Sequence, residues 1–215
     1  MKKYFILNFF IFIYIIGFSQ SFHGGLNLGA TISQVDGDSH SGFHKVFPSG
    51  GVYVRTEFLN SDWGISMSIL YKNKGSRSFK KNEYGDVIDN YAIKLHYIEV
   101  PFLFTYLIKK IGIPGLFEYK FKRDLYIELG PSFGYLIKGT EYFDNLDYRT
   151  IDFKRYEIAL HAGLTYGLND HWFLNFRYSY TFPFLPIAPH PGGQVYWLNR
   201  GMYNNNMNFS LIYEF

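Results

Sequence analysis

The amino-acid sequence predicts an all-β fold, an eight-stranded antiparallel up-and-down transmembrane β-barrel. Apolar and polar residues alternate in eight separate segments, and a period of two is typical of a strand with two unlike faces. Aromatic residues make up 21% of the chain, with 20 Tyr and 23 Phe, a richness typical of a barrel wall that faces lipid. The polar faces also gather Arg and Glu side chains, which are costly in the apolar core of a soluble sandwich.

The N-terminus predicts export. Lys2 and Lys3 precede an apolar run that ends near Phe18, and small residues follow it. This pattern is typical of a secretory signal peptide, which we place at residues 1–19 with cleavage near Ser19/Gln20, leaving the barrel domain at 20–215. A retained membrane-spanning helix needs about 20 apolar residues, and this run is shorter. The chain has no Cys, so a lipoprotein anchor and disulfides are excluded.

The first four strands are expected at residues 22–33, 49–59, 63–72 and 93–107. Each has one apolar face and one largely polar face, as a strand between lipid and a polar lumen requires. The outward faces carry, in chain order, Leu26, Leu28, Ala30 and Ile32; Val52, Val54 and Phe58; Trp63, Ile65, Met67, Ile69 and Tyr71; and Ile98, Val100, Phe102, Phe104 and Tyr106.

The second four strands repeat this pattern at residues 124–137, 153–167, 172–182 and 207–215. The last is the clearest, since five apolar or aromatic residues alternate with a mostly polar set up to the final Phe215. The outward residues of these strands are Leu125, Ile127, Leu129, Phe133 and Tyr135; Tyr156, Ile158, Leu160, Ala162, Leu164 and Tyr166; Trp172, Leu174, Phe176, Tyr178, Tyr180 and Phe182; and Met207, Phe209, Leu211, Tyr213 and Phe215.

The connections predict the orientation of the barrel. Those after the second and sixth strands are short, whereas those after the first, third, fifth and seventh are longer and polar. Short turns on the periplasmic side and long loops outside are the habit of outer-membrane barrels, so both chain ends are expected in the periplasm. The exception is the connection at 108–123, which should be periplasmic although it is long, and which we expect to bend or to form an extra hairpin.

The inward faces are expected to form a charge network in the lumen. An eight-stranded barrel has an interior just wide enough for side chains to fill, so we interpret the network as structural and expect no solute channel. An alternative interpretation treats the carboxylates and the histidine as acid and base groups in a cavity. The network residues are Arg55, Glu57, Glu99, Glu128, Arg155, Glu157, His161, Arg177 and Glu214.

Other candidate sites are weaker. His40 and His44 lie four apart in the first long connection, and His190 lies in the last one. Their spacing is too loose to predict a metal site, and no cofactor-binding or catalytic motif occurs, so we expect no catalytic, cofactor or metal residues. The formal net charge is only +3, which gives no reason to expect a nucleic-acid partner. The connections at 72–90 and 183–191 are the best candidates for contacts outside the cell.

At this point the sequence resembles a known family. The resemblance lies in the run from Tyr97 to Phe104 (Tyr-Ile-Glu-Val-Pro-Phe-Leu-Phe), the run from Leu129 to Tyr135 (Leu-Gly-Pro-Ser-Phe-Gly-Tyr), the strand around Arg177 and the aromatic terminus. Together they look like the outer-membrane β-barrel domain of Bacteroidota, the PorT-like family. The resemblance implies the same barrel over the whole mature chain and, for the founding branch, an association with type IX secretion and gliding. It implies no catalytic residues.

These observations leave one leading function and two alternatives. The leading hypothesis is a non-enzymatic integral outer-membrane barrel with a structural or interaction role, exerted through surface loops or through a secretion- or gliding-associated assembly. Its expected partners are outer-membrane lipid, the barrel assembly machinery through the C-terminal strand, and a surface or periplasmic protein. The first alternative is a small barrel enzyme acting on outer-membrane lipid, which would need a nucleophile near the outer leaflet. The second is a secreted lipocalin-like carrier, which would have an apolar interior.

Overall fold

The computed structural model describes residues 22–38, 45–81, 84, 87–113, 117–143, 146–147, 151–190 and 201–215. Within these ranges no helix is long and apolar enough to cross a membrane. The predicted signal peptide and the two histidines of the first long connection, His40 and His44, lie outside the described residues. Both expectations therefore stay predictions.

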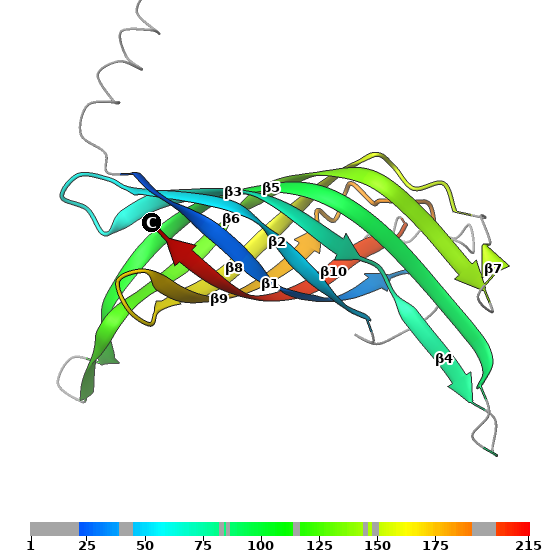
Figure 1. Cartoon of the computed structure of the whole chain (residues 1–215), viewed down its shortest axis with the longest axis horizontal. Coiled ribbons are helices and arrows are strands. Elements are labelled where there is room, and N and C mark those ends of the chain that lie inside the picture. Colours follow the sequence, from blue (N-terminus) through cyan, green and yellow to red (C-terminus); the bar gives the residue numbers. More distant parts are fainter. Residues whose placement is uncertain are drawn as a thin grey trace, which may run out of the picture.

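Eight antiparallel strands close into a barrel, which confirms the predicted fold (Figure 1). The ring closes because β1 pairs with β10, and β5 pairs with β6, so that no strand of the ring is left with an open edge. The eight strands of the ring are β1 (Phe22–Asp36), β2 (Lys45–Glu57), β3 (Trp63–Lys74), β5 (Val87–Ile113), β6 (Phe117–Phe143), β8 (Tyr156–Gly167), β9 (Trp172–Thr181) and β10 (Tyr203–Glu214).

Two further short strands extend the sheet beyond the ring. The strand β4 (Arg77–Lys81) pairs with the first part of β5, and β7 (Leu146–Asp147) pairs with the last part of β6. The strands β5 and β6 are each 27 residues long, so the expected bounds of 93–107 and 124–137 were too short at both ends. We call the part made by β4, β7 and the adjoining parts of β5 and β6 the extracellular extension.

The alternation of the sequence translates into two unlike barrel faces. On β8 and β9 exposed and buried residues alternate along nearly the whole strand, and the exposed set is the apolar one predicted to face outward. Leu160, for example, is 47% exposed, whereas the preceding inward residue, Ala159, is buried. The apolar residues lie outside and the charged ones inside, which is the reverse of a lipocalin-like carrier.

The two ends of the barrel differ as predicted. Phe22 and Phe215 lie at the same end as the short turns at 58–62 and 168–171. The rule for outer-membrane barrels predicts that this end is periplasmic, and the names given below to the two ends follow that prediction. Aromatic pairs stand there, with ring centroids 4.8 Å apart for Trp63 and Tyr106, and 4.8 Å apart for Trp172 and Tyr213. We call these two pairs the periplasmic aromatic belt.

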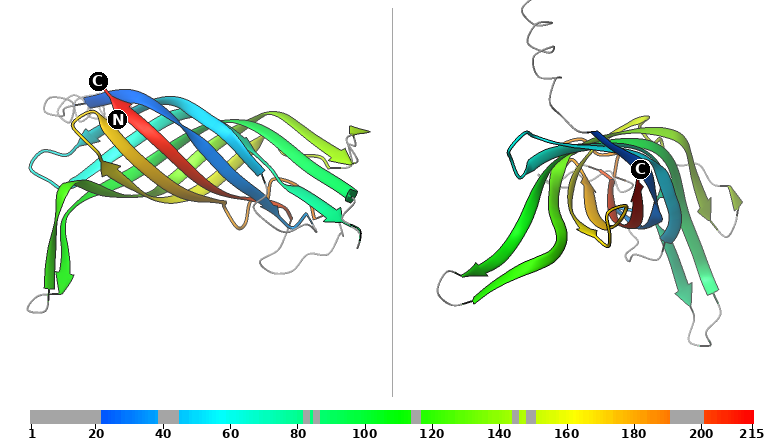
Figure 2. Two further views of the ribbon diagram at one scale, coloured as in Figure 1. Left: turned by 60° about the horizontal axis from the view of Figure 1, so that its bottom comes forward. Right: turned by 60° about the vertical axis from the view of Figure 1, so that its left-hand side comes forward.

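The long connection at the periplasmic end is a hairpin. The ladder between β5 and β6 continues past the barrel to the pair Ile113 and Phe117, with a register shift between Ile108 and Lys110. Figure 2 shows this hairpin leaving the barrel sideways instead of continuing along its axis. The expected bend and the expected extra hairpin therefore occur together.

Apolar side chains close the lumen at both ends. The cluster at the extracellular end joins the last connection to β1, β5 and β6, and the cluster at the periplasmic end joins β2, β6, β9 and β10. The first consists of Val35, Tyr91, Ile93, Leu95, Tyr97, Leu136, Ile187, Ala188 and Met202; the second consists of Tyr53, Tyr126, Phe173 and Ile212. Most of the charged lumen lies between these two clusters, but at the periplasmic end the side chain of Glu57 is 40% exposed.

Candidate functional site

The lumenal charge network divides into three groups that follow the barrel axis. Inward positions recur every second residue along a strand, so neighbouring strands bring charged residues of the same face together at successive levels. We name the groups by their central cations: the Lys74 cluster, the Arg177 cluster and the Arg55 cluster.

The Lys74 cluster is the most deeply buried of the three. The Lys74 ammonium lies 2.5 Å from one carboxylate, that of Glu99, and 2.9 Å from another, that of Glu157. Glu99 also accepts a hydrogen bond from Lys72 at 2.7 Å. All four residues are at most 2% exposed, so they are shielded from the solvent outside the barrel, and charge neutrality depends on the pairing itself.

Glu157 joins four strands of the barrel. Besides the ammonium on β3, its Oε1 accepts a hydrogen bond of 2.6 Å from the Thr181 hydroxyl on β9 and one of 3.0 Å from the Asn204 amide on β10. Since Glu157 itself lies on β8, one carboxylate ties β3, β8, β9 and β10 together across the lumen. Such a cross-link holds the barrel against radial expansion.

The Arg177 cluster occupies the next level. Arg177 donates from Nη2 to Glu128 at 2.8 Å and from Nε at 3.3 Å. The same carboxylate accepts hydrogen bonds from Thr165 at 2.9 Å and from Asn175 at 3.0 Å. Glu128 thus has several donors, as a buried carboxylate requires.

The Arg55 cluster closes the lumen toward the periplasm. Arg55 donates to Glu214 through Nε and Nη2, both at 3.1 Å, and also bonds Glu57. Its guanidinium lies 4.7 Å from the ring centroid of Tyr126, whose hydroxyl accepts from Arg55 at 2.8 Å and donates to Glu57 at 3.0 Å. The side chain of Glu57 is 40% exposed, so this cluster meets solvent, unlike the other two.

One triplet in the Lys74 region resembles catalytic machinery. His161 Nε2 lies 2.8 Å from the Ser132 hydroxyl and 3.5 Å from Glu99. In a serine hydrolase the acid contacts the second ring nitrogen, so that the imidazole can take a proton from the serine. Here serine and acid contact the same nitrogen, and Nδ1 has no hydrogen-bond partner among the described residues. The triplet is also sealed from substrate, because His161 is 1% exposed.

Most of the predicted network residues point into the lumen, but Arg155 does not. The strand β8 begins at Tyr156, one residue later, and Arg155 is exposed. The preceding chain instead passes over the mouth: the Arg155 carbonyl accepts from the Leu136 amide at 2.8 Å, and Lys154 donates to Ile187 at 2.7 Å. The prediction of an inward Arg155 was wrong because the alternating pattern continued into a segment that is no longer a strand.

Sequence reasoning left two cations out of the network: Lys72 was expected on the inward face of its strand but was not counted in the network, and Lys74 was missed. The strand at 63–72 was expected to end at Lys72, and the residues after it were assigned to a loop. The strand β3 in fact runs to Lys74, which places that side chain inside. The missed signal is the continued parity, since Lys72 and Lys74 both share the inward face of Ser66 and Ser68. With them, the three clusters together hold four cations, Arg55, Lys72, Lys74 and Arg177, and five carboxylates, Glu57, Glu99, Glu128, Glu157 and Glu214.

No metal site is evident in the described part of the chain. Across residues 22–38, 45–81, 84, 87–113, 117–143, 146–147, 151–190 and 201–215, no group of three or more His, Cys, Asp or Glu side chains could hold an ion. His190 is described and belongs to no such group.

A family profile matches most of the chain. The profile described as Outer membrane protein beta-barrel domain matches residues 18–183. No curated protein is significantly similar to the chain.

Several solved structures are similar to this chain at low sequence identity. Ail, the attachment invasion locus protein of Yersinia pestis, solved in complex with the heparin analogue sucrose octasulfate, is 15% identical, with 91% of this chain and 99% of that chain covered and a TM-score of 0.46. Neisserial surface protein A is 9% identical, with 92% and 99% covered and a TM-score of 0.36. OprG from Pseudomonas aeruginosa is 12% identical, with 91% and 95% covered and a TM-score of 0.35. Likeness at this level says nothing about what the chain binds.

Proposed function

Because this chain belongs to the outer membrane protein β-barrel domain family, we propose that it is a non-enzymatic integral outer-membrane barrel with a structural or interaction role. One observation carries the proposal: the lumen is sealed. Lys72, Lys74, Glu99 and Arg177 are each at most 1% exposed. A solute channel would leave such side chains in contact with water, as in porins.

The enzyme alternative has less support. A hydrolase acting on outer-membrane lipid needs a nucleophile and a base at a surface that lipid can reach. The triplet of Ser132, His161 and Glu99 lies inside the sealed lumen and has the wrong connectivity at the imidazole. The geometry therefore favours the structural interpretation of the network.

The extracellular extension is the part best suited to contact a partner. It stands beyond the barrel in Figure 1, and its Tyr84 is 90% exposed. Arg77 and Lys138 are also exposed. Elements held out by a rigid barrel are typical carriers of binding function. We assign the interaction role to this extension.

The sealed lumen is tested by electrical recording. The purified chain, refolded and inserted into planar bilayers, is expected to give no discrete channel openings, because the paired side chains of the Lys74 cluster are buried in the lumen. A stable open current in the unmodified protein would overturn the proposal.

The orientation is tested on intact cells, where the absence of native Cys allows single-cysteine variants. A membrane-impermeant maleimide should label Tyr84→Cys on whole cells, and should label Leu59→Cys in the periplasmic turn only after the outer membrane is permeabilised. Both residues are highly exposed, so a difference in labelling reports the side of the membrane. Labelling of Leu59→Cys on intact cells would mean that the end with the short turns faces outside, and that the extracellular extension instead lies in the periplasm.

Three finer assignments belong to the same proposal. Removal of residues 1–19 would leave Gln20 as the first residue, which N-terminal sequencing of the membrane-extracted protein checks.

The C-terminal strand, with its aromatic end at Phe215, would be the segment recognised by the barrel assembly machinery. The PorT-like kinship within Bacteroidota, with its link to type IX secretion and gliding, is supported by the run from Tyr97 to Phe104.

A further inference from the structure

The hairpin at the periplasmic end has no part in the proposed function. We call residues 108–113 and 117–124 the periplasmic hairpin. Its ladder is continuous with β5 and β6, from the pair Ile108 and Leu125 outward through Lys110 and Lys120 to Ile113 and Phe117. A two-stranded hairpin is at best marginally stable in water by itself. Some surface that covers one of its faces is therefore expected.

The hairpin runs sideways from the barrel. Both views of Figure 2 show it turning away from the barrel axis and out beyond the barrel wall. The turn coincides with the register shift between Ile108 and Lys110, and such irregularities bend a strand. An element that leaves a membrane barrel in this direction extends along the membrane surface.

Two ion pairs fasten the base of the hairpin to the neighbouring turns. On one side Lys109 lies 2.5 Å from Asp62 in the turn between β2 and β3. On the other side Arg123 donates to Asp170 at 2.9 Å, in the turn between β8 and β9. The hydrogen bond to Asp62 raises the pKa of the Lys109 ammonium. The hairpin therefore contacts the neighbouring turn on each flank.

The hairpin leaves the barrel at the depth of the membrane interface. Its first residue, Ile108, comes two residues after Tyr106, which packs on Trp63 in the periplasmic aromatic belt. Aromatic belts mark the boundary between hydrocarbon and headgroups. The lipid-facing surface of β5 and β6 therefore passes directly into the hairpin.

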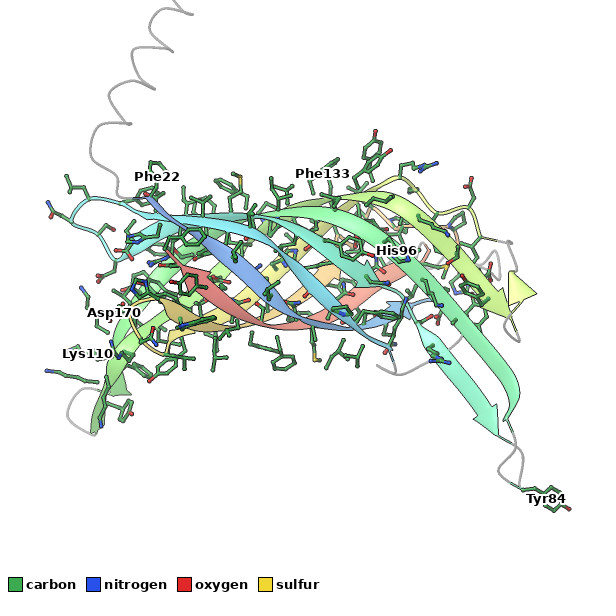
Figure 3. The ribbon with its side chains drawn as sticks, in the orientation of Figure 1. Phe22, Tyr84, His96, Lys110, Phe133 and Asp170 are labelled. Atoms are coloured by element: carbon green, nitrogen blue, oxygen red, sulfur yellow. The ribbon has the colours of Figure 1, made fainter. Side chains whose placement is uncertain are left out.

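The register gives the hairpin two unlike faces. Tyr119 pairs with Ile111, and Phe121, two residues on, shares its face. The two rings pack edge to face with centroids 5.2 Å apart, and Tyr119 is 59% exposed. Lys120 pairs with Lys110 on the opposite face, and Lys110 projects from the hairpin away from the barrel in Figure 3.

The hairpin carries an excess of basic residues. Lys109 and Arg123 are paired with Asp62 and Asp170, which leaves Lys110, Lys120 and Lys122 on the face opposite the rings, against Glu118 and Asp124. An element with one aromatic face and one lysine face lies in a bilayer interface, with its rings in the headgroup boundary and its cations at the lipid phosphates.

We propose that the periplasmic hairpin lies flat on the periplasmic leaflet of the outer membrane and binds anionic phospholipid headgroups. The hairpin direction, the continuity with the aromatic belt and the basic face all favour a lipid surface over a periplasmic protein. A protein partner would leave the aromatic face accessible to water in pure lipid, which gives the proposal a clear test.

The test uses the full chain refolded into vesicles with one spin-labelled cysteine at a time. The labels replace Tyr119 and Phe121 on the aromatic face, and Lys120 and Lys122 on the basic face. Collision with oxygen reports lipid, and collision with a water-soluble nickel complex reports solvent. The vesicles contain phosphatidylcholine alone or an equimolar mixture with phosphatidylglycerol. A label at Leu129 on the barrel wall supplies the reference for a lipid environment.

We expect labels at 119 and 121 to collide mainly with oxygen and labels at 120 and 122 mainly with nickel. The alternation should be stronger with phosphatidylglycerol. It should be lost in a background that carries Lys110→Gln, Lys120→Gln and Lys122→Gln. In that background the barrel must still be closed, which is checked by a change in gel mobility between unheated and boiled samples. Equal nickel collision at all four positions in both vesicles would overturn the proposal and would favour a protein partner. Alternation that is unaffected by phosphatidylglycerol would overturn the headgroup part of it.

Discussion

The Lys74 cluster and the Arg55 cluster perform the same cross-linking task in different environments. In the Lys74 cluster one ammonium serves Glu99 and Glu157, and no side chain reaches water. In the Arg55 cluster a guanidinium holds Glu214 through two hydrogen bonds, while its other carboxylate, Glu57, meets solvent. The difference predicts where the loss of one charged side chain destabilises the barrel most. Water can solvate the charge that is left behind only in the Arg55 cluster, so a loss in the Lys74 cluster should cost more.

The largest effect is expected for Lys74→Met. The substitution leaves two buried carboxylates without their shared cation, and breaking a buried pair costs about 3–5 kcal/mol. The free energy of unfolding in lipid vesicles, followed by tryptophan fluorescence in urea, measures the loss. Lys72→Met is the matched control, since Glu99 then keeps Lys74 at 2.5 Å, and it should cost clearly less. Equal losses would mean that the two lysines are interchangeable and that the bridging position has no special role.

The second effect compares the two faces of β8. Leu160→Arg places a charge on the lipid face, where Arg near the midplane costs about 2–4 kcal/mol. Glu157→Gln changes the lumen but keeps an oxygen that accepts from Thr181 and Asn204, so its cost should be smaller. The same urea titration, with the heat-dependent gel shift as a check on barrel closure, distinguishes them. A larger loss for Glu157→Gln would reverse the comparison between lipid face and lumen.

A third experiment measures how the sealed cluster shares its charge. In a cycle of Lys74→Met, Glu157→Gln and the double variant, removing Glu157's charge should restore part of the stability lost with Lys74. Glu99 still has Lys72 at 2.7 Å in the double variant, so no carboxylate is left unpaired. We expect a coupling energy of about 0.5–3 kcal/mol, as for residues in one network. Additive single effects would show that the ion pair seen at 2.9 Å contributes nothing.

Much of this arrangement could be predicted from the sequence, and the alternation explains why. A closed barrel gives every strand one lipid face and one lumen face, so the parity of a residue predicts its side. Glu99, Glu128, Glu157 and Arg177 were placed inside on this ground alone, and all four are buried. Which cation meets which carboxylate was not predictable, because strand shear sets the level of each residue and the sequence carries no direct record of it.

The two wrong assignments, Lys74 and Arg155, occur at strand ends, where the barrel wall no longer separates lipid from the lumen. Beyond the membrane both faces of a strand meet water or protein, so the pattern no longer marks the strand. For this reason Lys74 was assigned to a loop, although β3 includes it. Arg155 shows the opposite error, since its alternation continued by chance into the segment that covers the barrel mouth.

The smallest effect is expected in the Arg55 cluster for Glu57→Gln. Its carboxylate is 40% exposed, and ion pairs open to solvent contribute about 0–1 kcal/mol. Salt screens exposed charges but hardly reaches buried ones, so the small loss should shrink further at high ionic strength, while the loss for Lys74→Met should stay constant. Glu214→Gln is the control within the same cluster, because it removes the buried carboxylate that binds Arg55 twice. If Glu57→Gln proved as costly as Glu214→Gln and insensitive to salt, the periplasmic end would be as tightly sealed as the centre of the lumen.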